Sequence, residues 1–545
     1  MPITIQPSVL KKRKANGTYE DVSPGVITHV DDALSAVSVS PVENRAVTAA
    51  INELRTDLTA LENQVNDIVY PASIAITKQP TKLDYEIDES FSKSGMEVTL
   101  YYSNGETEVL DNSEISFTPA VFPANGVYTV TISYQREGYT LTANTSVNVF
   151  SVRRYGFRRE KSNSDCEGRI TYLFDAVGKT PAGMVSYSSA GVGTFDPGSW
   201  GEFINAVARP VMLKYDGTVD YELDHEDQTK KFDGTASDIS DPDYAGNAMV
   251  EFKGEYKWVK RYEDTDYEYV IFCNAEYDSD YHAYAHTNDS GVVKDAFYLG
   301  MWCGPSINNV LRSIGSGGAV INGQTAEVEI TRAKANGTGY NILYKSAWDY
   351  VSDLLTLISK TDDSQDAFGN GVDSVLNVRQ VAGTLKDKGG FYGQTNAKQS
   401  SMKVFWLVDY WGNLWQRMAG CIMDSGVIKT RMTGPYCDTP VSAPDYSTYT
   451  DAGIAALDIT GTSGNLTGKH TTTDAHGYLP IKANGATNQY IPDSFYYNKS
   501  DVRFAFVGAG YNTAANRAGS RCLTLAYAAS ATYATSGSRL SYIPE

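Results

Sequence analysis

The sequence of 545 residues lacks any apolar run near the roughly 20 residues that a membrane-spanning helix needs. It also lacks an apolar stretch behind the basic residues Lys11–Lys14, so we expect no secretory signal at the N-terminus. Its six cysteines lie far apart without a CxxC pair, which argues against a zinc cluster or a disulfide framework. These absences predict a protein that is made in a reducing compartment and is not inserted into a membrane.

Basic residues are also few. The chain has 46 Lys and Arg against 65 Asp and Glu, a formal net charge of −19. Nucleic-acid-binding proteins neutralise phosphates with a basic face, so this balance argues against that class. Residues 211–300 hold 21 acidic and 8 basic residues, and alternation there predicts strands that expose acidic side chains on one face. Tyrosine is abundant instead: 38 residues, which is typical of surfaces that bind by contact.

Hydrophobic periodicity predicts a helix at about residues 46–70. Apolar residues recur there at alternating spacings of 4 and 3: Val47, Ile51, Leu54, Leu58, Leu61, Val65 and Ile68. This is a heptad seam, and the β-like segment that follows leaves nowhere in the same chain to bury it. We therefore expect a coiled coil and a homo-oligomer. The seam residues do not separate a dimer from a trimer, and a trimer is our expectation. The alternative is an amphipathic helix packed on its own globule.

From about 71 to 150 the apolar period drops to two. Alternating segments at 73–77, 96–102, 126–134 and 139–149 are separated by turn signals. Short strands over about 80 residues predict a β-sandwich. The segment resembles bacterial immunoglobulin-like modules in its Tyr85-x-x-x-Glu89-x-Phe91 pattern and its Gly126–Tyr134 strand. That resemblance implies a spacer or a weak glycan contact, of which we favour the spacer.

Few residues beyond 150 suggest catalysis. His282 and His286 have the spacing of two metal ligands on a helix but lack the Glu of HExxH, so surface histidines are the simpler interpretation. Asp362–Asp366 resembles a calcium loop without EF-hand register, which favours capping and turn roles. No Gly-x-Ser-x-Gly elbow occurs. We therefore predict no enzyme activity, no cofactor and no required metal.

Two further features are structural. Ser346 is a plausible N-cap for a helix whose apolar face includes Trp348, Leu354 and Ile358. Trp406, Trp411 and Trp415 fall within thirteen residues, which indicates a core hub more than a platform for stacking sugars.

Several motifs carry a resemblance to known families. Ser38-x-x-Pro-Val-x-Asn-Arg-x-Val-Thr48 resembles the lead-in to coiled coils of bacteriophage tail proteins, and Tyr410-Trp-Gly-Asn-x-Trp-x-Arg417 resembles the formylglycine-generating-enzyme branch of the C-type lectin fold. The stretch 502–541, with Gly508, Gly519, Leu523-x-Leu525 and Gly537-x-Arg-Leu-Ser541, is similar to the variable region of ligand-binding proteins diversified by retroelements. The cysteine pair of the enzymes is not matched, so their activity does not carry over.

Retroelement diversification leaves a compositional trace. In that family the altered codons end in C and cannot encode Lys, Glu, Gln, Trp or Met. Residues 501–544 contain none of these five types, whereas their 79 occurrences in the chain predict about six. A segment rich in Ser, Thr and Ala would also tend to lack them. The resemblance implies that fixed Gly, Leu and Arg positions hold the fold while interleaved positions contact a receptor. Those positions are Tyr511, Asn512, Thr513, Asn516, Arg517, Ser520, Arg521, Thr524, Ala526, Tyr527, Thr532, Tyr533, Thr535 and Ser536.

Together these features predict a multidomain, mostly β chain with an α+β C-terminal domain. Its expected parts are a tail-attachment segment (1–45), a coiled coil (46–70), an immunoglobulin-like β-sandwich (71–150), an acidic β-rich part of the head (151–300) and a C-type lectin-like head (301–545) with a variable region at about 501–542. The expected function is that of a phage tail fibre or tip adhesin, located in the virion and made in the host cytoplasm. It would bind a host protein or glycan and, through its N-terminus, other tail or baseplate proteins. The alternatives are a bacterial surface adhesin with the same head or, least favoured, a capsule-degrading tail enzyme.

Overall fold

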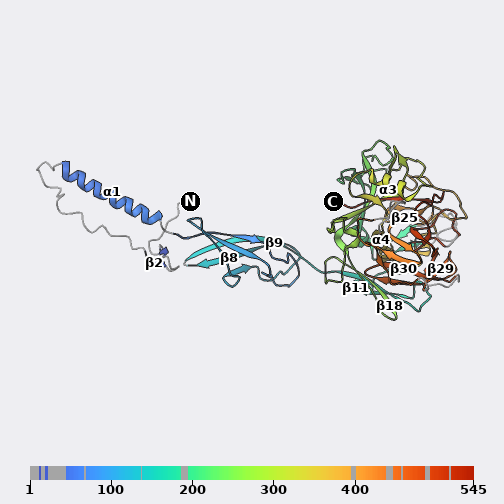
Figure 1. The fold of residues 1–545 in the computed structure, drawn as a ribbon, viewed down its shortest axis with the longest axis horizontal. Helices are drawn as coiled ribbons and strands as arrows, with labels where there is room; N and C mark the ends of the chain where they lie inside the picture. The colour runs from blue at the N-terminus through green and yellow to red at the C-terminus, as the bar shows by residue number, and fades with distance from the viewer. Residues whose placement is uncertain are drawn as a thin grey trace. The chain divides into compact units, whose positions relative to one another are not determined.

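The computed structural model describes residues 11–13, 19–21, 44–66, 69–136, 138–185, 194–393, 400–436, 446–455, 458–484, 491–514 and 517–545. The chain divides into two compact units, Met1–Ser151 and Val152–Glu545, which we call the N-terminal unit and the head (Figure 1). Within the described residues, no helix has both the length and the apolar character needed to cross a membrane.

The predicted N-terminal helix is present as α1, Asn44–Asn66. The described seam side chains are about half-exposed: Ile51 45%, Leu54 54%, Leu58 55% and Leu61 48%. The side chains of Val47 and Val65, and residue Ile68, lie outside the described residues. The described part of the seam therefore stays open to solvent in the single chain. Before α1, β1 (Lys11–Arg13) pairs with β2 (Tyr19–Asp21).

The β-sandwich of the N-terminal unit is built from two sheets. One has the order β3-β5-β6 and the other β4-β9-β8-β7. The strands are β3 (Pro71–Lys78), β4 (Asp84–Glu86), β5 (Glu97–Tyr102), β6 (Thr107–Leu110), β7 (Ile115–Thr118), β8 (Gly126–Arg136) and β9 (Tyr139–Phe150). Leu100, Phe122, Val130 and Ile132 are fully buried between the sheets. The four strands predicted from alternation are confirmed; the short strands β4, β6 and β7 were not predicted.

The head contains three larger sheets. The first is the six-stranded β15 (Val219–Glu222), β14 (Ala208–Lys214), β16 (Gly246–Lys253), β19 (Ala296–Cys303), β35 (Arg539–Tyr542) and β22 (Tyr340–Ile342). The second is the four-stranded β11 (Ile170–Phe174), β10 (Arg154–Glu160), β18 (Tyr267–Cys273) and β17 (Trp258–Glu263). Because β19 pairs with both β16 and β35, residues from either side of position 300 share one sheet.

The third sheet holds most of the C-terminal strands. Its order is β27 (Thr450–Asp451), β26 (Val427–Thr430), β25 (Trp415–Asp424), β32 (Val502–Val507), β33 (Leu523–Tyr527), β31 (Ile491–Tyr497), β29 (Asn465–Thr473), β30 (Gly477–Ala483) and β28 (Thr460–Gly461), with β34 (Ser536–Gly537) paired to β25. The described residues of the head also form three two-stranded pairs: β12 (Gly183–Val185) with β13 (Thr194–Asp196), β20 (Ser306–Ile307) with β21 (Val310–Leu311), and β23 (Lys403–Val404) with β24 (Leu407–Val408).

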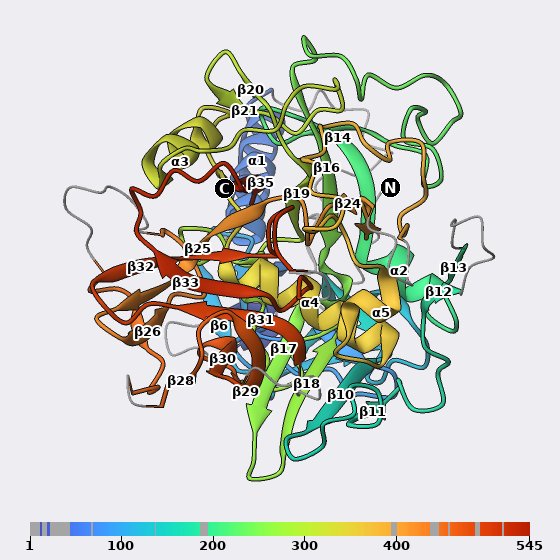
Figure 2. The ribbon, with the colours of Figure 1, turned by 90° about the vertical axis from the view of Figure 1, so that its right-hand side faces the viewer.

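Helix α4, Lys345–Ser359, lies at the centre of the head (Figure 2). All of its residues are buried, and it contacts β10, β25 and β30. The predicted helix is thus confirmed, but its N-cap is Tyr344, and Ser346 is a buried residue inside the helix. The other helices are α2 (Gly201–Val207), α3 (Ala326–Lys334) and α5 (Ser364–Phe368), with short 3-10 turns at η2 (Gly254–Tyr256) and η3 (Tyr284–His286).

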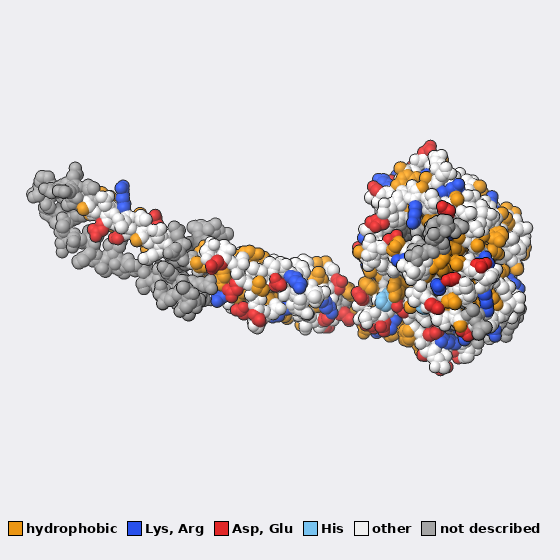
Figure 3. All heavy atoms as spheres, viewed as in Figure 1, with side chains coloured by type: hydrophobic (Ala, Val, Ile, Leu, Met, Phe, Trp, Pro, Cys, Tyr) orange, Lys and Arg blue, Asp and Glu red, His pale blue; other side chains and the backbone are white. Residues whose placement is uncertain are grey.

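The acidic segment 211–300 differs from its expected structure. Strands β16 and β19 are almost entirely buried, so they do not expose an acidic face. Many acids lie in turns instead, where a carboxylate accepts the backbone N–H two residues on: Asp216, Asp224, Asp227, Asp233, Asp241, Asp264 and Asp278. Asp favours such turns because its side chain bonds its own backbone. Figure 3 shows charges of both signs interspersed on one face of the head.

Candidate binding surfaces

Two tyrosines of the predicted contact face lie together on the head. Tyr527 ends β33 and is half-buried, whereas Tyr533 is 47% exposed in the loop that follows. Their ring centroids are 4.6 Å apart, and Phe506 packs beside Tyr527 at 6.0 Å. Such an aromatic pair offers a large, rigid contact area with two hydroxyl groups at its edge.

The loop of Tyr533 meets a second loop, which holds Tyr511. Trp415 donates its backbone N–H to the carbonyl of Thr535 at 2.8 Å, and Tyr511 donates its own to Asn413 at 2.8 Å. A methyl group on Gly510 would lie 3.1 Å from Cβ of Thr535, so the two loops are in contact. Tyr511 and Thr535 are half-buried, and Asn512 and Thr532 are exposed.

An apolar patch adjoins this surface and was not predicted. Val375, Leu376, Val378 and Val381 are 64%, 38%, 55% and 45% exposed, and the N–H of Ser374 bonds the carbonyl of Thr513 at 2.8 Å. Contiguous exposed aliphatic side chains commonly mark interaction sites. Their spacing in the sequence resembles neither a strand nor a helix face, so no periodicity signalled them.

Five residues of the predicted contact face are buried, which corrects the prediction. They are Thr513, Ser520, Arg521, Thr524 and Ser536. Thr524 is buried together with its neighbours Leu523 and Leu525, so both faces of β33 are covered at this point. Arg521 is an internal cation, paired with Asp353 and with its guanidinium 4.8 Å from the Tyr478 ring.

The other three buried residues also make hydrogen bonds. The hydroxyl of Thr513 accepts the N–H of Gly510, that of Ser536 donates to the carbonyl of Tyr533, and the N–H of Ser520 donates to Ser364. Arg517 is half-buried and donates to the carbonyl of Gly464 at 3.0 Å. Ala526 is half-buried, and Asn516 lies outside the described residues.

The positions expected to hold the fold are buried. Leu523, Leu525 and Leu540 are at most 1% exposed, and a side chain on Gly519 would collide with the carboxylate of Asp493. Arg539 donates to the carbonyls of Gly300, Met301, Val408 and Asp409 and to the side chain of Gln416. It thereby joins β35 to three distant segments. Trp406, Trp411 and Trp415 are 8% exposed or less, which confirms the core hub.

Buried charges form a network that the sequence did not suggest. Arg159 bonds Glu268 and Asp362 at 2.7 Å each, and His470 contacts Glu268 at 2.9 Å. Burial would raise the pKa of Glu268, but His470 and Arg159 outweigh it and lower that pKa to about 2. Asp362 is thus a partner of buried arginines, while its neighbour Asp363 caps α5 as predicted.

The two histidines with metal-like spacing occupy different environments. His282 is part-exposed and lies 3.2 Å from Asp474, whereas His286 is fully buried between Phe297 and Tyr350. The surface interpretation was therefore wrong for His286. Burial lowers the pKa of His286 to about 3, so its ring is neutral at pH 7. Within the described ranges, no group of three or more acidic, His or Cys side chains has the geometry of a metal site.

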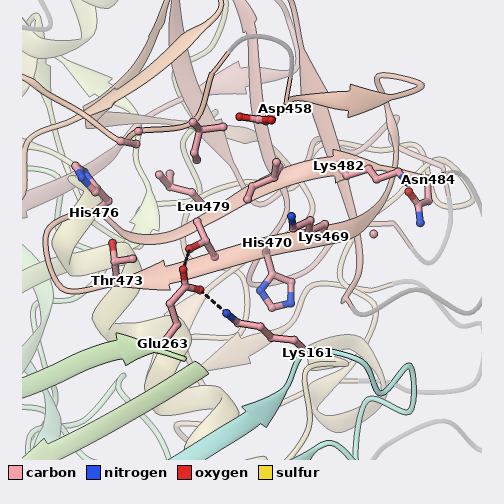
Figure 4. A pocket seen from close by; sticks show the side chains of 16 residues that line it. Lys161, Glu263, Asp458, Lys469, His470, Thr473, His476, Leu479, Lys482 and Asn484 are labelled. Atoms are coloured by element: carbon pink, nitrogen blue, oxygen red, sulfur yellow. Dashed lines mark hydrogen bonds and ion pairs between the residues drawn. The ribbon is translucent and has the colours of Figure 1, made fainter. Parts of the chain in front are cut away.

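The head also has a hollow of about 740 Å³ beside β29 and β30 (Figure 4). Basic side chains enter it from separate segments: Lys161 from the turn after β10, Lys469 from β29 and Lys482 from β30. Lys161 pairs with Glu263 at 3.0 Å, and Thr471 donates to the same carboxylate at 2.9 Å. The sequence did not suggest this site, because its walls are up to 323 positions apart between residues 161 and 484.

Comparison with known families concerns the N-terminal unit. No curated protein matches the chain at a significant level. Residues 78–149 match the bacterial Ig-like domain (group 3), and this range covers six of the seven strands of the observed sandwich. The two-sheet topology, the alternating strands and this match together identify residues 78–149 as a bacterial immunoglobulin-like domain of group 3.

Proposed function

We propose that this chain is the adhesin of a phage tail fibre or tip and that its head binds a receptor on the bacterial surface. The observation that carries the proposal is the half-exposed apolar seam of α1 next to an immunoglobulin-like domain. A seam of this kind is stable when copies of the chain pair along it. An oligomer then presents several heads at once, and linked binding can raise avidity by roughly 10²–10⁴-fold.

The motifs at 410–417 and 502–541 support a C-type lectin fold for the head, of the kind diversified by retroelements. In this proposal the role is binding, not catalysis. The contact face comprises the predicted residues that remain accessible: Tyr511, Asn512, Arg517, Ala526, Tyr527, Thr532, Tyr533 and Thr535. The apolar patch at Val375–Val381 extends it. Aromatic and aliphatic area beside hydrogen-bonding groups suits a protein receptor, because such interfaces have apolar centres and polar rims.

Binding of the labelled full chain to a panel of bacterial strains tests this function. We expect saturable binding to some strains, and Tyr527→Ala with Tyr533→Ala should reduce it at least tenfold. Tyr533 is exposed, so its truncation should change the free energy of unfolding by only about 0.5 kcal/mol, whereas truncation of the half-buried Tyr527, which packs against the head core, should cost about 1–3 kcal/mol. Binding to no strain, or unchanged binding by the variant, would contradict the proposal.

Leu525→Ala is the matched control in the same strand. Leu525 is fully buried, so its truncation should cost about 2–5 kcal/mol through lost burial and a cavity. Where the variant remains folded, it should still bind the same strains. Chemical denaturation of both variants therefore separates a contact residue from a core residue.

A further inference from the structure

Two lysines that line the hollow beside β29 and β30 have no neutralising partner among the described residues. Lys469 and Lys482 are direct cross-strand partners in the β29–β30 register, and both are exposed. Among the described residues, neither lysine makes an ion pair. Like charges directly opposite each other destabilise a strand pair. An anionic group bound in the hollow near both lysines would offset this like-charge repulsion.

The acids of the hollow are already engaged. Glu263 is held by Lys161 and by Thr471, and Asp458 accepts the backbone N–H of Ala455 at 3.2 Å. The charges of Lys469 and Lys482 are thus uncompensated locally, on a chain whose formal net charge is −19. Such a local reversal of sign favours an anionic ligand.

The other residues that line the hollow indicate which kind of molecule carries the anionic group. Asn484, Thr473 and His476 offer hydrogen-bonding groups, while Ile454, Leu479 and Ile481 offer aliphatic surface. A hollow of about 740 Å³ is far larger than a lone phosphate and lies within the roughly 300–1,000 Å³ of ligand pockets. None of its described lining residues is Phe, Tyr or Trp, so the only aromatic surface in the hollow is that of His470 and His476.

Glycine at position 468 fits this arrangement. Gly468 lies within β29, and a side chain at this position would collide with the side-chain amide of Asn484. The register also shifts on either side of Lys469, and this bulge aligns Lys469 with Lys482. Bulges re-aim side chains next to functional sites.

We propose that this hollow binds an acidic saccharide, with Lys469 and Lys482 on its anionic group. Thr473 and Asn484 bond its hydroxyls, and the aliphatic wall contacts its C–H surface. The inference rests on the proposed function in taking a bacterial surface polysaccharide as the source. It adds a second binding site, distinct in its residues from the contact face around Tyr527 and Tyr533.

Calorimetric titration of the full chain with defined sugars tests the proposal. The probes are trigalacturonic acid, its uncharged methyl ester, N-acetylneuraminic acid and glucose 6-phosphate. We expect at least one acidic sugar to bind. Its affinity should fall as the salt concentration is raised, because salt screens exposed charges. The methyl ester should bind at least tenfold more weakly than trigalacturonic acid if the carboxylate is recognised. If glucose 6-phosphate is the only probe that binds, the anionic group recognised in the hollow is a phosphate.

The double variant Lys469→Gln with Lys482→Gln should bind the acidic sugar at least tenfold more weakly. Its melting temperature should not fall, because the substitutions remove the repulsion between two like charges. The control, Lys230→Gln with Lys334→Gln, removes two other exposed lysines of the head and should leave binding unchanged. Should the first variant not fold, Lys482→Gln alone replaces it. Binding of no acidic probe at millimolar concentration, equal binding of the ester, or unchanged binding by the lysine variant would overturn the proposal.

Cell binding separates this proposal from the adhesin proposal. The variant Tyr527→Ala with Tyr533→Ala should bind the acidic sugar as the unmodified chain does. A chain that binds the sugar but no bacterial strain would contradict the adhesin function and leave the saccharide site standing. A chain that binds cells but no acidic probe would contradict the saccharide site alone.

Discussion

At the scale of single residues, the head keeps ionisable groups in its interior. Asp493 is fully buried in β31, and its carboxylate accepts the backbone N–H of Arg521 at 2.7 Å. Burial raises the pKa of Asp493 to about 8, with the nearby Asp363 adding to the effect. The absence of a side chain at Gly519 leaves room for this carboxyl group. Asp493 is therefore mostly protonated in the folded protein at pH 7.

The pKa of Asp493 has a consequence for stability. The unfolded chain releases the Asp493 proton near pH 3.9, whereas the folded chain keeps it up to about pH 8. Between these values the folded state binds more protons, so this residue lowers the free energy of unfolding as pH rises, by at most about 1.4 kcal/mol per pH unit. Asp493→Asn should remove this contribution and stabilise the protein more at pH 8 than at pH 5. Urea denaturation at both values measures the difference; an equal effect at both would mean that the carboxyl ionises normally.

At the scale of elements, the sequence patterns predicted where helices and strands form, but they did not predict which strand faces are buried. The heptad spacing of Leu54 and Leu58 predicted α1, and strict alternation predicted the longer strands of the sandwich. Alternation also placed Leu523 and Leu525 inside, but it wrongly placed Thr524 outside. Alternation separates two faces of a strand without revealing whether a second layer covers the outer one.

The candidate sites show the same limit. Arg521 in a polar loop resembles a contact residue, and only the tertiary structure places Asp353 beside it. The pairing of Lys469 with Lys482 depends on two register shifts within β29–β30, which no local pattern encodes. Tyr527 and Tyr533 were predicted from the resemblance of residues 502–541 to a family of ligand-binding proteins, and the structure places their two rings side by side.

The exposed seam of α1 leads to a prediction about assembly. Leu54→Asp with Leu61→Asp places two carboxylates on a surface that would be desolvated in a coiled coil, where an unpaired charge is costly. The variant should be monomeric by light scattering, whereas the unmodified chain should be an oligomer, with a trimer expected. Glu53→Gln with Asn63→Ser, two substitutions on the outer face of the same helix, is the control and should leave the mass unchanged. An unchanged mass for the leucine variant would show that another interface holds the assembly.

At the scale of the whole molecule, the two units have separate hydrophobic cores. The core of the N-terminal unit comprises residues between Ile74 and Val149, and the main core of the head comprises residues between Tyr155 and Ile543. The head core includes β35 near the C-terminus, which pairs with β19 and β22. Folding of the head therefore requires contacts such as the pairing of Leu299 with Ser541, 242 positions apart, whereas the sandwich closes within 80.

Separate cores predict separate unfolding, since a domain with its own core can fold alone. A protease site placed between Ser151 and Val152 should release two fragments that each unfold cooperatively. In the uncleaved chain, calorimetry should show two transitions, and Leu525→Ala should lower only that of the head, because Leu525 belongs to the head core. The matching substitution in the sandwich, Leu100→Ala, should lower only the other transition. A single transition that both substitutions shift equally would contradict the division, because the two cores would then be energetically coupled.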